Sequence, residues 1–231
     1  MRSLLHILVF LQICQRLCLA EVRTLVVLPF ANESRTPGLH WMSECFPELL
    51  EERLKWPGLN ILGREERLLA FDRIGIPYTR SLSKASSIKI GQELDAGLLV
   101  LGAFESDGKK LEVSLSVLDL RDNLLKPVIQ ETGDLEQFQT ICGRLGWKIL
   151  SQIDPTFPMS LDSYLGRFPV IPNLALENYV RGLIESDRES RFNFSGKLIR
   201  AIQIMRKRFF NWGNSITRKR TIRPLLCGCN G

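Results

Sequence analysis

The chain has 231 residues, 45% of them apolar and 24% charged, which is enough for a folded domain with a hydrophobic core. Its formal net charge is +6, but residues 195–231 hold nine Lys or Arg and no Asp or Glu, and the rest of the chain has 22 basic against 25 acidic residues. The rest of the chain is therefore mildly acidic and shows no electrostatic footprint for nucleic acid, so the basic excess that could bind it lies in the terminal segment alone.

Residues 1–20 have the pattern of a secretory signal peptide, with an early positive charge, an apolar run at 4–13 and a small-residue cleavage site before Glu21. The run is much shorter than the roughly 20 residues that cross a bilayer. We therefore expect an exported protein, periplasmic or extracellular after cleavage near Ala20, with no transmembrane segment in the mature chain. Arg16 is untypical of a cleaved signal, so an uncleaved signal anchor is the alternative.

Strands and helices alternate in the first half of the body. A continuous apolar run at 25–30 is typical of a strand buried on both faces of a sheet. Apolar residues at helical spacing predict a core-facing helix at 40–55. A short strand at 59–62 and helices at 64–74 and 83–94 are expected next.

The predicted helix at 40–55 contains a proline and several acidic residues. Pro47 has no backbone donor, so we expect it to kink or shorten the first turns. Glu48, Glu51 and Glu52 lie off the apolar stripe. They are expected to form a solvated face.

The second half of the body predicts an antiparallel meander. A buried strand at 98–104 is followed by turn residues at 106–108 and by apolar and polar alternation at 111–117, which indicates a hairpin with one face in water. A third strand is expected at 126–131, at an edge of the sheet, because Pro127 cannot donate to a ladder.

These elements predict a mixed α/β fold over residues 21–153, in the order β-α-β-α-α-β-β-β-α, with helices packed on the sheet. We expect Asp134 to cap the last of these helices. Four prolines indicate that residues 154–172 are a Pro-rich linker. Its aromatic residues are expected to pack on a neighbouring surface; they are Phe157, Tyr164 and Phe168.

A short helical, repeat-like segment is predicted at 173–194, and a disordered basic tail at 195–231. Asn173 can cap the helix. Its apolar side consists of Leu176, Tyr179, Val180, Leu183 and Ile184. A lone amphipathic helix has no surface to bury against, as expected of a helical repeat that is cut short.

Four short stretches share a resemblance: Leu25-Val26-Val27-Leu28-Pro29-Phe30-Ala31-Asn32, Leu39-His40-Trp41, Val100-Leu101-Gly102 and Leu118-Asp119-Leu120. Together they resemble the TolB amino-terminal-like, FlgO-like domain of bacterial cell envelopes. In many bacterial chains this domain precedes tetratricopeptide repeats, and residues 176–182 resemble the first helix of such a repeat. The resemblance covers about residues 23–185. It implies an envelope protein-interaction module with protein partners and no established catalytic residues.

The basic tail has two interpretations. Reading residues 203–218 two nucleotides later gives, with permitted wobble bases, PNYAKALFQLGKFYYEK, which contains the L-x2-L-G-x2-Y spacing of a tetratricopeptide helix. The codons of 211–213 force the Leu-Gly pair. We therefore interpret the tail as out of frame after a shift between Ser190 and Ile199. The alternative is a nucleic-acid or anionic-surface arm that uses Arg206, Lys207, Arg208, Arg218, Lys219 and Arg220.

The body offers few groups for catalysis. His40 is the only histidine outside the predicted signal, and we expect a capping or packing role, since a catalytic triad needs a base with an orienting partner. No glycine-rich phosphate loop is present. Asp119 and Asp122 are expected to serve the turn after the hairpin. We predict no catalytic, cofactor-binding or metal site.

Cys45 and Cys142 are the only two cysteines of the body, and they fall on different predicted helices. Export would permit a disulfide between them. Two buried thiols that act as small apolar side chains are the other possibility. The sequence leaves both open, because a bridge depends on geometry.

Overall fold

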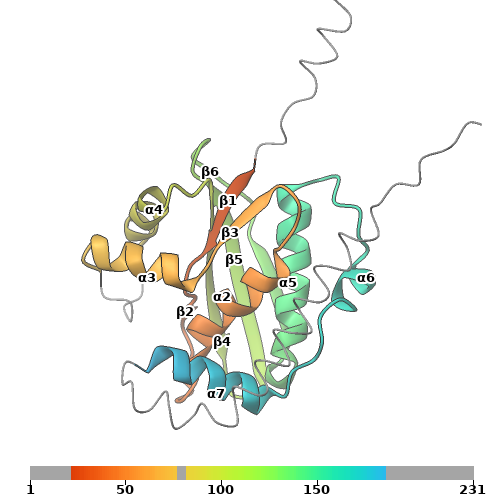
Figure 1. Cartoon of the computed structure of the whole chain (residues 1–231). Helices are drawn as coiled ribbons and strands as arrows, with labels where there is room; N and C mark the ends of the chain where they lie inside the picture. The colour runs from red at the N-terminus through yellow and green to blue at the C-terminus, as the bar shows by residue number, and fades with distance from the viewer. Residues whose placement is uncertain (1–21, 77–81, 186–231) are drawn as a thin grey trace, which may run out of the picture. The chain divides into compact units, whose positions relative to one another are not determined.

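The computed structural model describes residues 22–76 and 82–185 (Figure 1). The chain forms two compact units, Met1–Val170 and Ile171–Gly231. The first is a sheet with helices, and the second has one described helix, α7 (Asn173–Ile184). The predicted signal peptide, the frame-shift region and the basic tail lie outside the described residues.

The first unit is built on a mixed seven-stranded sheet. The strands are β1 (Arg23–Val27), β2 (Ala31–Asn32), β3 (Leu59–Leu62), β4 (Leu98–Ser106), β5 (Lys110–Asp119), β6 (Leu124–Leu125) and β7 (Ile129–Asp134). β3, β1 and β4 are parallel neighbours, and β5 pairs antiparallel with β4, β6 and β7. The predicted order of elements is confirmed. The two-residue strands β2 and β6 are additions too short to leave a periodic signal.

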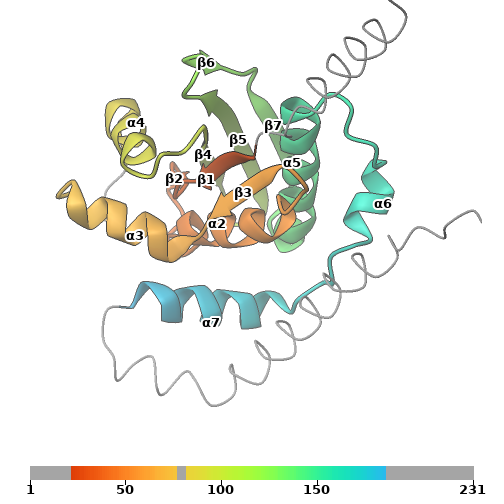
Figure 2. The same ribbon diagram turned by 45° about the horizontal axis from the view of Figure 1, so that its top comes forward.

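Helices cover the two faces of this sheet. They are α2 (Met42–Arg53), α3 (Arg64–Arg73), α4 (Lys84–Glu93), α5 (Phe138–Ile153) and α6 (Leu161–Leu165), with a 3-10 turn at Leu135–Gln137. Figure 2 shows α5 and the α3–α4 pair on opposite sides of the strands. α2 packs beside α5. The mixed α/β fold is therefore confirmed.

The apolar run at 25–30 contributes side chains to the cores on both faces of the sheet. Val26 and Leu28 join a buried cluster with Phe71 of α3 and Ile90 of α4. On the other face, the ring of Phe30 stacks on Phe46 of α2 with centroids 4.7 Å apart. The continuous apolar run therefore serves two cores.

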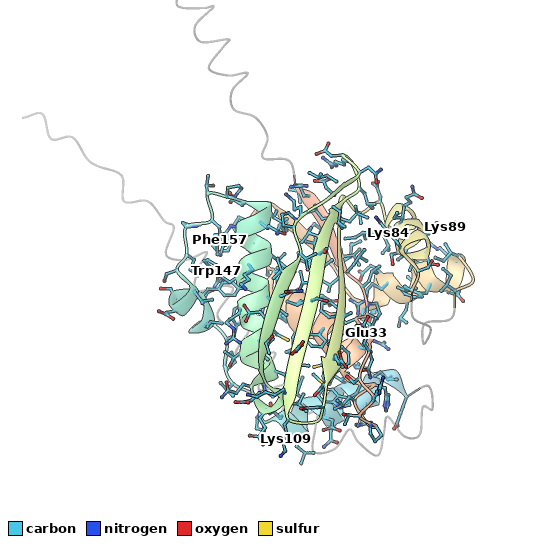
Figure 3. All side chains as sticks on the ribbon, turned by 180° about the vertical axis from the view of Figure 1, so that it is seen from behind. Glu33, Lys84, Lys89, Lys109, Trp147 and Phe157 are labelled. Atoms are coloured by element: carbon cyan, nitrogen blue, oxygen red, sulfur yellow. The ribbon has the colours of Figure 1, made fainter. Side chains whose placement is uncertain are left out.

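The α3–α4 pair leaves part of its face open. Viewed from behind, β4, β5 and β7 carry no described helix over them (Figure 3). On β5, Val113, Leu115 and Val117 are buried, whereas Glu112 is exposed and Ser114 is half-buried. The predicted wet face of the hairpin is confirmed.

α2 continues through Pro47 and is not shortened there. A proline cannot donate to the carbonyl four residues earlier, which is that of Ser43. This carbonyl instead accepts the backbone N–H of Phe30 at 3.0 Å. The proline thus frees an acceptor that ties α2 to the chain after β1.

Two predicted helix caps are not formed. The Asp134 side chain makes no cap hydrogen bond. It accepts one from Nζ of Lys110 at 2.7 Å, because the two residues face each other in the β5–β7 register. Asn173 lies within the first turn of α7, after Pro172, and Pro172 is the cap position.

Candidate functional site

The structure places the two predicted cysteines inside the protein. Cys45 of α2 and Cys142 of α5 are free thiols, 1% and 0% exposed. Burial raises the pKa of both thiols, that of Cys142 to about 12. A negative charge on Cys142 also raises the pKa of Cys45. Thiols with such a high pKa are poor nucleophiles at neutral pH.

The other candidate groups have structural roles. His40 is exposed, and its carbonyl accepts the Ser43 N–H at 3.2 Å. Asp119 accepts the N–H of Arg121 at 3.1 Å and pairs with Arg23. Among residues 22–76 and 82–185, no group of three or more His, Cys, Asp or Glu could hold a metal ion. No helix in these ranges is long and apolar enough to cross a membrane.

The acidic side of α2 is not the solvated face that the sequence predicts. Arg67 of α3 is fully buried, and its Nη2 lies 2.5 Å from Oε1 of Glu44 and 3.8 Å from Oε1 of Glu48. Its Nη1 pairs with Glu51. These three carboxylate side chains are only 3%, 15% and 14% exposed. The network fixes α2 against α3, because each buried charge depends on the others.

A visible signal for this network is the i, i+4, i+7 spacing of the three glutamates, which puts them on one helix face. The sequence does not show that a guanidinium approaches that face. Glu52, by contrast, pairs with exposed Lys55 at 2.5 Å and behaves as predicted.

Residues 154–170, which we call the clasp, pack against the C-terminal end of α2. Tyr164 is fully buried, and its hydroxyl donates to the carbonyl of Arg53 at 2.7 Å. The rings of Trp56, Phe157, Tyr164 and Phe168 form a chain with successive centroid distances of 4.8, 6.1 and 5.2 Å. The aromatic packing expected of this segment is present.

The clasp also packs against α5. A Cβ at Gly143 would lie 2.5 Å from Cδ2 of Leu165, and one at Gly146 would lie 2.7 Å from the Tyr164 hydroxyl oxygen. Nε1 of Trp147 donates to the carbonyl of Met159 at 2.8 Å, in the region that Figure 3 labels beside α5. Two glycines on one helix face therefore admit the clasp closely.

A group of exposed apolar side chains lies at one end of the sheet. Leu124, Leu125 and Val128 are 55%, 45% and 59% exposed. Val22 is also 59% exposed. The next residue, Arg23, forms an ion pair with Asp119, and Asp119 lies opposite Leu124 in the β5–β6 register. β6 and the start of β1 lie at the same end of the sheet (Figure 1), with β4 and β5 between them. We call Val22, Leu124, Leu125 and Val128 the apolar tip; such patches mark contact surfaces.

The open face of the sheet carries a second distinctive group. Glu105 of β4 lies opposite Glu112 of β5, and both are exposed. Glu33, also exposed, donates its backbone N–H to the Phe104 carbonyl and lies beside β4 in Figure 3. Like charges directly across a strand pair are unfavourable, so this acidic row does not stabilise the sheet.

No family model matches the sequence, and no curated protein matches it. Among solved structures, the chain is similar to the LpoB C-terminal domain of Salmonella enterica, with 12% identity, 49% of this chain and 83% of that one covered, and a TM-score of 0.42. It is also similar to lipoprotein GNA1162 of Neisseria meningitidis, with 14% identity, coverage of 58% and 99%, and a TM-score of 0.41. TolB of Acinetobacter baumannii has 11% identity, coverage of 58% and 29%, and a TM-score of 0.39. These likenesses are too distant to assign a function to this chain.

Proposed function

We propose that the chain is an exported, non-catalytic protein-interaction module of a bacterial cell envelope, and that it binds a protein partner through the apolar tip. The main support is the exposure of Leu124, Leu125 and Val128 within five residues of one another. Backbone hydrogen bonds order the chain at Leu124 and Leu125, because β6 pairs with β5 and the Lys126 N–H donates to the Val117 carbonyl at 2.8 Å. A backbone that is already ordered loses less conformational entropy when a partner binds.

A charge placed in the tip tests this function. The double variant Leu124→Glu, Leu125→Glu is compared with Leu69→Glu, which alters an apolar side chain of similar exposure, 57%, on α3. In native size analysis of envelope extracts, we expect wild type and the Leu69 variant in a complex larger than the free chain, and the double variant outside it. A complex that persists in the double variant would refute the tip as the binding surface.

Export has its own test, because the predicted signal lies outside the described residues. Amino-terminal sequencing of the protein recovered from the envelope should give Glu21 as the first residue. An intact Met1 in a membrane fraction would show an uncleaved anchor.

We further propose that the sheet domain precedes a tetratricopeptide scaffold. Support comes from the repeat-like residues 176–182 on α7 and from the Leu-Gly pair forced in the shifted frame. The nucleotide sequence between the codons of Ser190 and Ile199 tests it. We expect a shifted frame that stays open through further repeats. A stop codon within a few codons would contradict this, and the tail should then be retained on heparin in a salt-dependent way.

A further inference from the structure

α2 and α5 pack with the same direction and in a definite register. At their N-terminal ends, Trp41 meets Phe138 edge to face, with ring centroids 5.8 Å apart. Toward the C-terminal ends, a Cβ at Gly146 would lie 3.2 Å from Cβ of Arg53. The two helices are therefore parallel, and the contact between them runs from their N-terminal ends toward their C-terminal ends.

The two cysteines come next along this contact. Cys45 follows Trp41 by four residues, and Cys142 follows Phe138 by four residues. Residues i and i+4 lie one above the other on the same face of a helix. Each thiol therefore occupies the position one turn beyond a contact that the two helices already make, and both thiols are buried there.

We propose that Cys45 and Cys142 are an oxidation site, at which a disulfide joins α2 to α5. Two S–H bonds break and one S–S bond forms. The two electrons and two protons pass to an acceptor disulfide, which becomes two thiols. The inference rests on the export in the proposed function, because reducing compartments keep such thiols reduced.

Burial determines when the bond can form. The attacking species in disulfide exchange is the thiolate, and the raised pKa of both thiols disfavours it in the folded protein. Oxidation should therefore occur as the two helices dock, or when they separate transiently. We expect the oxidation rate of the folded, reduced chain to rise when moderate denaturant is added.

Peptide mapping detects the bond directly. The full chain, with its four other cysteines replaced by serine, is refolded with oxidised glutathione and digested with trypsin without reduction. The fragments 36–53 and 122–144, which hold Cys45 and Cys142, should appear as one linked species that separates on reduction. Cys45→Ser in the same background is the control and should give no linked species. Two unlinked fragments with free thiols would overturn the inference.

The stability of the oxidised and reduced protein gives a second test, which needs no further variant. The bond closes a loop that contains β3 to β7, so it restricts the unfolded chain. We expect the oxidised protein to unfold at a higher denaturant concentration than the same protein after reduction. An equal or lower midpoint would show that the native packing does not accommodate the bond. Both experiments use purified protein. If Cys45 and Cys142 are linked in vitro but reduced in cells, the result would refute export and would still support the oxidation site.

Discussion

Removing one hydroxyl from the clasp should cost a large part of the stability of the sheet domain. In Tyr164→Phe, the carbonyl of Arg53 loses its donor at 2.7 Å in a place where the Tyr164 side chain is fully buried. A hydrogen bond contributes about 1 kcal/mol net, and a buried group left unsatisfied costs about 1–3 kcal/mol. We therefore expect a loss of about 2 kcal/mol. Burial also raises the pKa of the hydroxyl, so it remains a donor at neutral pH.

Urea denaturation of the full chain measures this loss. The control is Thr140→Val, which removes an exposed hydroxyl from α5 and keeps the β-branched shape. We expect the midpoint to fall in Tyr164→Phe with an unchanged slope, and to stay near wild type in the control. A loss below about 0.5 kcal/mol in Tyr164→Phe, the range of ordinary surface substitutions, would refute the role of the clasp.

Three further outcomes are expected. Arg67→Ala should lower the free energy of unfolding by about 3–5 kcal/mol, because it leaves buried carboxylates without a counter-charge. The control Arg73→Ala removes an exposed ion pair and should lower it by less than about 1 kcal/mol. Gly146→Ala should lower the unfolding temperature although Ala favours helices, because its Cβ would lie 2.7 Å from the Tyr164 hydroxyl oxygen. The control is Gly182→Ala, whose Cβ meets no atom within 4 Å and which should not lower the unfolding temperature. The pKa of the Asp107 carboxyl, measured by NMR titration, should lie below its ordinary value of about 3.9, because the backbone N–H groups of Lys109 and Lys110 donate to its carboxylate. Its contribution to stability should be complete above that ordinary value and be lost as the pH falls through the lower folded pKa; an ordinary titration would contradict the turn geometry.

Local patterns were sufficient for most of the fold. The strand at 59–62 has the bounds that its apolar residues predict, and Ser106-Asp107-Gly108 turns the hairpin with Gly108 at a φ of +93°. Such elements follow from periodicity and turn chemistry, which need no knowledge of distant residues. The order of the elements could therefore be predicted.

The contacts that give the molecule its particular form could not be predicted, because each depends on a partner far along the chain. Pro47 was expected to disturb α2, and its effect depends on the N–H of Phe30. Glu44 is buried because Arg67 faces it. The apolar tip has no periodic pattern, since only the path of β5 and β6 leaves Leu124 and Leu125 exposed.

Photocrosslinking in intact cells tests the proposed function most directly. A photoreactive amino acid is placed at Leu125 in the apolar tip, and at Glu112 on the open sheet face as the matched position, since both side chains are exposed on β-strands. We expect a discrete adduct with another envelope protein from Leu125 and none from Glu112. An adduct from Glu112 alone, or none from any position of the tip in cells that export the chain, would contradict the tip as the surface through which this protein binds its partner.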